Sequence, residues 1–148
     1  MISSPYFIPS ENLLHTIRRV ALSGVKVTLI IPGIPDKKVV YKVGESFFNK
    51  LLECGVNIYR YKPGFNHQKT ILVDNKIAFV GSINMDIRSL VHHFECGAIL
   101  YQTPCLLDIK NDFNEMIEVS EKVSPEFKLP KRQILLCALI CFLSSLRT

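Results

Sequence analysis

Helix-forming and strand-forming stretches alternate along the first part of the chain, and this alternation is what most restricts the fold. Ser10 is suited to cap a helix that begins at Glu11 and ends near Gly24. The stretch 25–31 is short, rich in β-branched residues and bounded by Pro32, as a strand covered on both faces is. This order predicts an α/β fold. The residues expected on the buried helix face are Leu13, Leu14, Ile17 and Val20 or Ala21.

The alternation continues to about residue 121 and predicts one mixed β-sheet flanked by helices. Asp36 is suited to cap a second helix that reaches about Cys54. A last helix is expected after Thr103, as cap, and Pro104, at the first helical position. Its expected buried residues are Leu106, Leu107, Phe113, Met116 and Ile117. The predicted strands are 56–61, 68–73, 77–80 and 96–101, the middle two forming a hairpin in which Asn75 takes a positive φ.

Two side chains of complementary chemistry, His67 and Lys69, follow the turn-forming stretch 62–66. Alternate residues of a strand point the same way, so the imidazole and the ammonium can reach one small anion together. Imidazole can attack phosphorus while the ammonium neutralises the oxygens, and this spacing predicts a phosphoryl-transfer site. A lone His-x-Lys pair is also common on solvated strand faces, so the interpretation depends on the residues that follow.

Those residues complete a known pattern. His67, Lys69 and Asp74 stand in the order His-x-Lys-x4-Asp, and Gly81, Ser82 and Asn84 follow as Gly-Ser-x-Asn. In this the chain resembles the phospholipase D superfamily. From about residue 3 to about residue 123 it looks like the second half of bacterial cardiolipin synthases; the matching segments are 4–9, 24–27 with Pro32 and Asp36, 55–59 and 81–90. The resemblance implies a phospholipase D-like domain that transfers a phosphatidyl group from one phosphatidylglycerol to another and releases glycerol.

The residue types indicate the roles. His67 is expected to attack phosphorus or to protonate the leaving oxygen, while Lys69, Ser82 and Asn84 stabilise the phosphate oxygens. The resemblance implies that Glu95 holds the other nitrogen of the imidazole. Asp74, the acid of the motif, lies too far along the strand for direct proton transfer and is expected to order the hairpin.

The segment after the motif contains two further polar residues, Arg88 and Ser89. Arg88 and Ser89 either brace this loop or belong to a simple surface salt bridge. No cofactor or metal is implied, because close clusters of His and carboxylates are absent from the motif and Lys69 supplies the charge.

The chain contains one such motif, whereas the family places two motifs face to face. The other histidines, His15, His92 and His93, lack a lysine two positions on. We therefore expect a half-site that is completed by a missing N-terminal half or by a homodimer partner. Two alternatives are open: a single-motif phosphodiesterase or nuclease that acts as a homodimer, and a catalytically silent fragment that binds a membrane. Few arginines and aromatic residues alternate near the motif, which disfavours nucleic acid as the partner.

Composition adds a membrane hypothesis. The net charge of the 148-residue chain is +5, with 18 Lys and Arg against 13 Asp and Glu, which favours anionic partners such as phospholipid headgroups. Residues 1–123 are predicted to form the catalytic half and 124–148 a tail, in which the uncharged run 134–143 is too short to span a bilayer. That run either packs on the domain or lies at the membrane surface. The predicted location is peripheral, on the cytoplasmic side of a bacterial membrane, without a signal peptide or spanning helix, and the five cysteines are expected to be reduced thiols.

Overall fold

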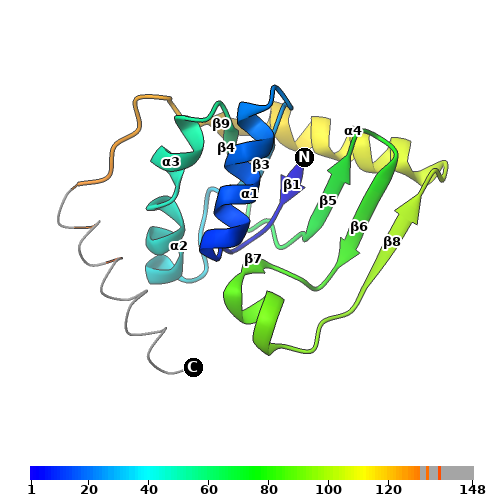
Figure 1. Cartoon of the computed structure of the whole chain (residues 1–148), viewed down its shortest axis with the longest axis horizontal. Helices are drawn as coiled ribbons and strands as arrows, with labels where there is room; N and C mark the ends of the chain where they lie inside the picture. Colours follow the sequence, from blue (N-terminus) through cyan, green and yellow to red (C-terminus); the bar gives the residue numbers. More distant parts are fainter. Residues whose placement is uncertain (131–132, 134–136, 138–148) are drawn as a thin grey trace.

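The computed structural model describes residues 1–130, 133 and 137, and shows helices on both faces of a seven-stranded sheet (Figure 1). The strand order is β8-β6-β5-β1-β3-β4-β9, and a separate two-stranded sheet pairs β2 with β7. Strands β1, β3 and β4 are parallel, and the remaining pairs of the large sheet are antiparallel. The predicted mixed α/β architecture is confirmed. The strands are β1 Ile2–Ser3, β2 Phe7–Ile8, β3 Thr28–Pro32, β4 Asn57–Tyr61, β5 Thr70–Val73, β6 Ile77–Gly81, β7 Met85–Asp86, β8 Gly97–Tyr101 and β9 Ser120–Lys122.

Four α-helices and a π-helical turn connect these strands in the described part of the chain. They are α1 Glu11–Leu22, α2 Lys38–Glu45, α3 Phe48–Leu52, η1 Arg88–His92 and α4 Cys105–Glu118. None of the helices that the structure describes is both long enough and apolar enough to cross a bilayer. The predicted helix after residue 10 is confirmed at both ends: the Leu13 N–H donates to Ser10 Oγ over 3.3 Å, and Gly24 has a φ of 92°.

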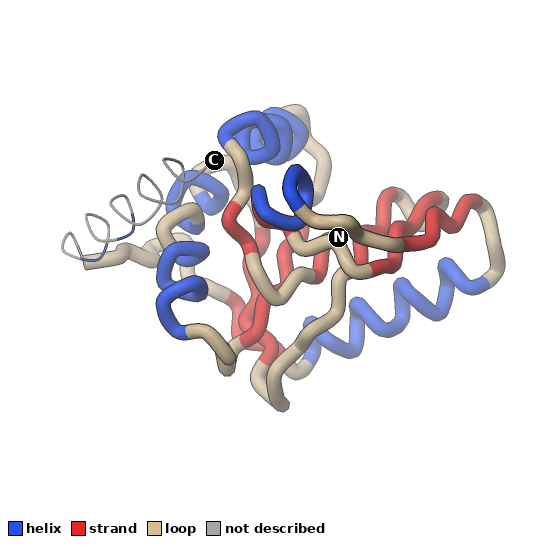
Figure 2. The backbone as a smooth tube through the Cα atoms, turned by 90° about the horizontal axis from the view of Figure 1, so that it is seen from below, coloured by secondary structure: helices blue, strands red, loops and turns tan. Residues whose placement is uncertain are grey.

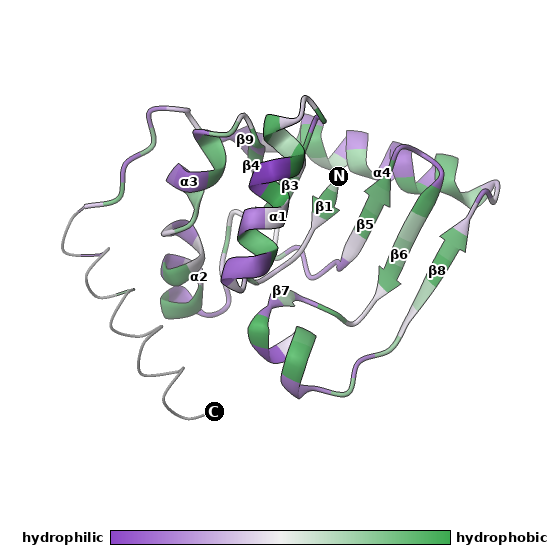
Figure 3. Cartoon of the chain, in the orientation of Figure 1, coloured by the Kyte–Doolittle hydropathy of each residue, from purple (hydrophilic) through white to green (hydrophobic). Residues whose placement is uncertain are grey.

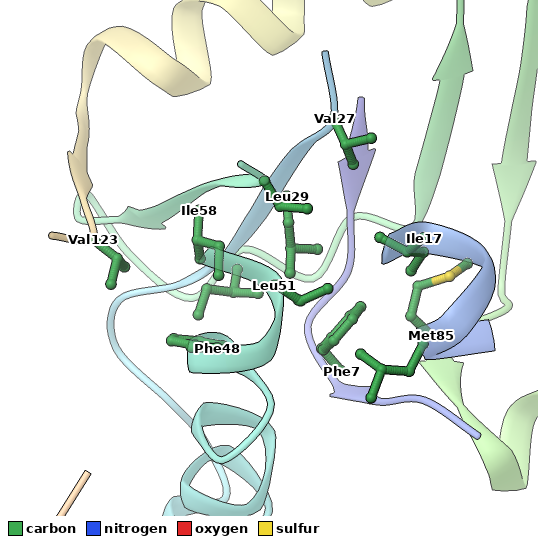
Figure 4. Close-up of a cluster of buried hydrophobic side chains, with 12 residues drawn as sticks. Phe7, Ile17, Val27, Leu29, Phe48, Leu51, Ile58, Met85 and Val123 are labelled. Atoms are coloured by element: carbon green, nitrogen blue, oxygen red, sulfur yellow. The ribbon is translucent and has the colours of Figure 1, made fainter. Parts of the chain in front are cut away.

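The sheet separates two apolar cores. On one face, α1 and α3 pack Ile17, Phe48 and Leu51 against Leu29 and other residues of the central strands (Figure 4). On the other face, α4 packs against the sheet, and Figure 2 shows it running beneath the strands. The residues of the α4 core are Ile30, Leu72, Ala78, Leu106, Phe113 and Met116. Both cores exclude water from the centre of the sheet and fix its register.

The prediction of one continuous second helix that reaches about Cys54 is wrong. The chain forms α2 and α3 with a break between them, where Ser46 Oγ donates to the Val43 C=O over 2.6 Å. Such a local hydroxyl bond competes with continuation of the helix. Asp36 does not cap α2, because its carboxylate accepts hydrogen bonds from the Tyr6 hydroxyl and the Lys37 N–H.

Smaller corrections concern element ends and the tail. The strand predicted from residue 25 begins at Thr28 instead, Pro104 precedes α4 rather than opening it, and Leu107 faces solvent. Phe127 packs on Phe48 with ring centroids 5.6 Å apart, so the chain beyond residue 123 contacts the domain. The predicted apolar run 134–143 lies outside the described residues except for Cys137, which is buried.

Candidate active site

The loop before β5 holds His67 between two anchored neighbours. The Asn66 amide donates to Ser3 Oγ and to the sulfur of Met116 on α4, over 3.2 and 3.3 Å. The Gln68 amide donates to Asp112, also on α4, over 2.6 Å. Since Asn66 and Gln68 turn toward α4, an extended chain turns the intervening His67 to the opposite side of the sheet.

Lys69 follows on that same side. Its ammonium donates to the His67 C=O over 2.7 Å, and its own C=O accepts from the Gly81 N–H over 3.2 Å. The regular strand β5 begins at Thr70, so Lys69 precedes it rather than lying in it as predicted, and His67 stands two residues earlier. Burial lowers the pKa of Lys69, and the charge of Glu95 opposes that shift. The charges of Lys69 and Glu95 therefore influence each other without forming an ion pair among the described residues.

The segment after β6 builds the second wall of the site. The Ser82 N–H donates a hydrogen bond to the Cys96 C=O over 2.8 Å, and Ser82 Oγ donates to Glu95. Ser89 is buried; it donates to the other oxygen of Glu95 and accepts from the Asn84 N–H over 3.0 Å. Ser89 thus braces the loop, as one of the two sequence interpretations proposed.

Glu95 occupies a different position from the predicted one. Its carboxylate bonds the hydroxyls of Ser82 and Ser89, and His93 Nδ1 lies 3.6 Å from it. These two hydroxyls are the main cause that lowers the pKa of Glu95. No hydrogen bond joins Glu95 to His67 in the described part of the chain, and the carboxylate that was predicted to orient the imidazole binds the two serine hydroxyls instead.

His67 itself is exposed and lies beside the ring of Phe65, with centroids 5.4 Å apart. Partial burial lowers the pKa of His67, the positive charge of Lys69 lowers it further, and the charge of Asp36 opposes both. A lowered pKa keeps the imidazole neutral, which is the form that can act as a nucleophile.

Two residues that the sequence analysis did not place in the site, Tyr6 and Asp36, lie on this side of the molecule. The Tyr6 hydroxyl donates to Asp36 over 2.5 Å, and burial followed by this bond raises the pKa of Tyr6 to about 12. Tyr6 follows β1 and Asp36 follows the parallel β3, so both leave the sheet at the carboxyl ends of neighbouring strands. Ligand-binding residues of α/β sheets collect at the carboxyl ends of the strands. This position is the signal by which Tyr6 and Asp36 could have been predicted from the sequence.

Asp74 and Arg88, the other polar residues singled out in the sequence, are not in contact with His67 or Lys69 in the described part of the chain. Asp74 lies at the tip of the β5–β6 hairpin, at the opposite end of β5 from Lys69. Asp74 and Asn75 both have positive φ, 49° and 54°, and the Lys76 N–H closes the turn onto Val73. Arg88 is exposed and forms no ion pair with the described side chains.

Asn84 lies in the segment between β6 and β7. The side-chain oxygen of Asn84 is buried without a hydrogen-bond partner in the described part of the chain. The residues that the structure describes contain no group of three or more metal-ligating side chains.

Comparison with known proteins identifies relatives in sequence. Residues 1–117 match the family model described as cardiolipin synthase, PLD-like domain. A cardiolipin synthase from Geobacillus thermodenitrificans is 46% identical over 114 residues, which cover 77% of this chain and 23% of that protein. A cardiolipin synthase from Halalkalibacterium halodurans is 43% identical over 122 residues, covering 82% of this chain and 24% of that protein. The chain thus spans about a quarter of the length of these relatives.

Solved structures share the fold at low sequence identity. Nuc, a phospholipase D family member from Salmonella typhimurium, superposes with a TM-score of 0.71 at 14% identity, over 82% of this chain and 79% of that chain. Phosphatidylserine synthase from Haemophilus influenzae superposes with a TM-score of 0.72 at 18% identity, over 97% of this chain and 39% of that chain. The predicted phospholipase D-like fold is confirmed.

Proposed function

The chain belongs to the family of phospholipase D-like domains of cardiolipin synthases, and from this membership we propose that it is the second half of an enzyme that transfers a phosphatidyl group between two phosphatidylglycerol molecules. The observation that carries the proposal is the pairing of His67 with Lys69 on one side of the sheet, opposite the hydroxyls bound to Glu95. These groups supply a nucleophile, a cation and hydrogen-bond donors around one position.

In the first step, a nitrogen of the neutral His67 imidazole attacks the phosphorus of phosphatidylglycerol. A P–N bond forms, the P–O bond to the glycerol headgroup breaks, and glycerol leaves with a proton from a general acid. Lys69 stabilises the charge that builds on the non-bridging oxygens. The Asn84 amide donates to the same oxygens, and so does the Ser82 hydroxyl once its proton turns from Glu95 to the phosphate.

In the second step, a hydroxyl of another phosphatidylglycerol attacks the phosphohistidine. The acceptor's O–H proton passes to a general base, the P–O bond forms as the P–N bond breaks, and cardiolipin leaves with His67 regenerated. The acid of the first step and the base of the second require a second imidazole, and general acid–base transfer of this kind contributes about 10²- to 10⁴-fold. We propose that a partner half or a second copy of the chain supplies it.

The proposed location is a membrane surface on the cytoplasmic side. The net charge of +5 favours contact with anionic headgroups, and the basic residues of the tail stand directly before its apolar run. Asp74 is proposed to act through the hairpin that it terminates rather than on the phosphate.

The test is a reconstitution. The chain is mixed with the N-terminal portion of the Halalkalibacterium halodurans enzyme in phosphatidylglycerol vesicles, and cardiolipin and glycerol are measured. Equal amounts of both products are expected, with a phosphoryl adduct on His67 in a peptide map. His67→Ala should abolish both, whereas the matched variant His92→Ala, at an exposed histidine of η1, should leave them unchanged.

Three results would oppose the proposal. Activity of His67→Ala at the wild-type level would show that His67 is not the nucleophile. Turnover by the chain alone, in a demonstrably monomeric form, would show that the reaction does not require a second imidazole. Cleavage of a DNA phosphodiester together with inactivity on phosphatidylglycerol would favour the nuclease alternative.

A further inference from the structure

Tyr6 and Asp36 form a polar pair that the two transfer steps do not use. Each oxygen of the Asp36 carboxylate accepts one hydrogen bond, from the Tyr6 hydroxyl over 2.5 Å and from the Lys37 N–H over 2.7 Å. Both oxygens can accept a further bond, because each keeps a lone pair. Asp36 is exposed, so these acceptor positions are open to a ligand.

The fold holds the loop that contains Asp36 at both ends. The Gly33 N–H donates to the Tyr61 C=O of β4 over 2.7 Å, and a Cβ at Gly33 would lie 2.5 Å from that oxygen. At the other end, α2 packs so closely on β2 that a Cβ at Gly44 would lie 3.0 Å from the Phe7 oxygen. Figure 3 shows the segment that enters α2 as hydrophilic. The carboxylate is therefore presented by a loop that the scaffold fixes, as a binding group requires.

Tyr6 is held beside the segment that contains Asn84. Strand β2 pairs with β7 in parallel, with Phe7 opposite Met85, and the Ser4 hydroxyl accepts from the Met85 N–H over 3.0 Å. The residues directly before the paired ones, Tyr6 and Asn84, therefore lie at the same end of this small sheet. Figure 1 shows the N-terminal segment passing beside β7. Since Asn84 is proposed to stabilise the phosphate, Tyr6 stands next to the phosphate position.

Asp36 lies near His67 without touching it. His67 precedes β5, which is antiparallel to β1, so His67 lies at the same edge of the sheet as Tyr6 and Asp36. The charges of Asp36 and Lys37 both act on the pKa of His67, in opposite directions. No ion pair joins Asp36 to His67 among the described residues, so the two side chains are not in direct contact. A phosphodiester with its phosphorus at His67 would have its headgroup within reach of Asp36.

The charges around Asp36 select the kind of headgroup. A carboxylate repels the anionic oxygens of a phosphate, so its ligand is a hydrogen-bond donor. A cationic donor is disfavoured, because the Lys37 ammonium already lies 5.3 Å from the centroid of the Tyr6 ring and Lys38 follows it. Neutral hydroxyls remain, and a glycerol headgroup carries a pair of them on adjacent carbons. A carboxylate binds a ribose hydroxyl in the same way in dinucleotide-binding folds.

We propose that Asp36 binds the hydroxyls of the glycerol headgroup of phosphatidylglycerol and thereby makes the site selective for a diol. Tyr6 is a positioning residue, because its hydroxyl fixes the Asp36 carboxylate. This inference rests on the proposed function, since it names the headgroup that the same site binds. The leaving oxygen of the first step and the attacking oxygen of the second take the same place on phosphorus, so one subsite serves both glycerol groups.

The test is a competition between two donor lipids in the reconstituted system with the N-terminal portion of the Halalkalibacterium halodurans enzyme. The vesicles contain equal amounts of phosphatidylglycerol and of phosphatidylpropanol, whose headgroup has no free hydroxyl. The ratio of glycerol to propanol released then measures the ratio of the two kcat/KM values. Asp36→Asn should lower this ratio by about 10- to 100-fold, the factor for a hydrogen bond to a charged group. Both lipids meet the same imidazole, so the influence of Asp36 on the pKa of His67 cancels in the ratio.

Two further variants separate the subsite from a general effect of substitution. Tyr6→Phe keeps the ring and removes the hydroxyl that fixes Asp36, so it should lower the ratio in the same direction but by less. Asp108→Asn is the matched control, because Asp108 is an exposed carboxylate in the first turn of α4, on the other face of the sheet. Its substitution should leave the ratio unchanged.

The inference is overturned if the wild-type chain releases the two alcohols in equal amounts, or if Asp36→Asn keeps the wild-type ratio. Its failure is separable from that of the proposed function. Cardiolipin formation without a preference between the two lipids would keep the transfer chemistry and refute the subsite.

A direct binding measurement covers the reverse case, in which no transfer occurs. The full chain is titrated with glycerol phosphate and with propyl phosphate while the His67 imidazole is followed by NMR. Tighter binding of glycerol phosphate that is lost in Asp36→Asn would support the subsite without the transfer chemistry. Equal binding of the two phosphates by the wild-type chain would refute the subsite.

Discussion

Gly97 provides the most direct test of how the site loop is packed. A Cβ at this position would lie 2.3 and 2.4 Å from two ring carbons of Phe79, where ordinary contacts begin at 3.4 Å. The φ of Gly97 is outside the left-handed range, so the clash alone carries the cost. Overpacking of this kind destabilises by about 1–3 kcal/mol. For a chain of this size about 2 kcal/mol lowers Tm by about 4–8 °C.

The expected loss in Gly97→Ala has a specific remedy. Phe79→Leu removes the ring atoms that clash, so the double variant should recover most of the lost Tm in a thermal melt followed by circular dichroism. Gly81→Ala is the matched control, because its Cβ would meet the backbone Cys96 oxygen at 2.4 Å and Gly97 Cα at 2.6 Å. Phe79→Leu should rescue that variant less, because it removes only the contact with the Phe79 ring at 2.8 Å and leaves both backbone contacts. Unchanged stability of Gly97→Ala, or equal rescue of both alanines, would refute this packing.

Three further predictions concern charge and hydrogen bonding. Lys69→Gln should raise the pKa of His67 because it removes the neighbouring positive charge, and Asp36→Asn should lower it, both measured by NMR titration of the imidazole. Ser89→Ala should raise the pKa of Glu95, read from its carboxyl carbon, since one of the hydroxyls that stabilise the carboxylate is lost. Glu45→Gln should destabilise the chain in urea by about 1.5–3 kcal/mol, the range for a hydrogen bond to a charged group, because the buried carboxylate accepts hydrogen bonds from Lys42 and Arg60 at 2.7 Å each.

The sequence predicted those parts of the fold that have strong local signals. The cap at Ser10, the glycine at residue 24 and the hairpin turn with Asn75 are set by neighbouring residues, and all three are confirmed. The strands β1 and β9 were missed because they contain only two and three residues. Each is defined by its partners across the sheet, and no periodicity can be read from so short a segment.

The site shows the same division between local and distant determinants. The positions of His67 and Lys69 on one side of the chain follow from alternation. The surroundings of Glu95 and Asp36 do not, because their partners Ser89 and Tyr6 come from other elements of the fold. The break between α2 and α3 did have a local signal that the prediction passed over, because Gly44 and Ser46 are weak helix formers.

The alternation of side chains along β5 links the core to the candidate site. Leu72 and Ala78 turn into the core under α4, so Val73 and Ile77 turn to the opposite face, and the anchoring of Asn66 and Gln68 extends the same order to His67 and Lys69. A slip of one residue would exchange the two faces and turn His67 and Lys69 toward α4. The contacts of α4 with Asn66 and Gln68 therefore do more than stabilise a loop. They hold His67 and Lys69 on the side of the sheet that faces away from α4.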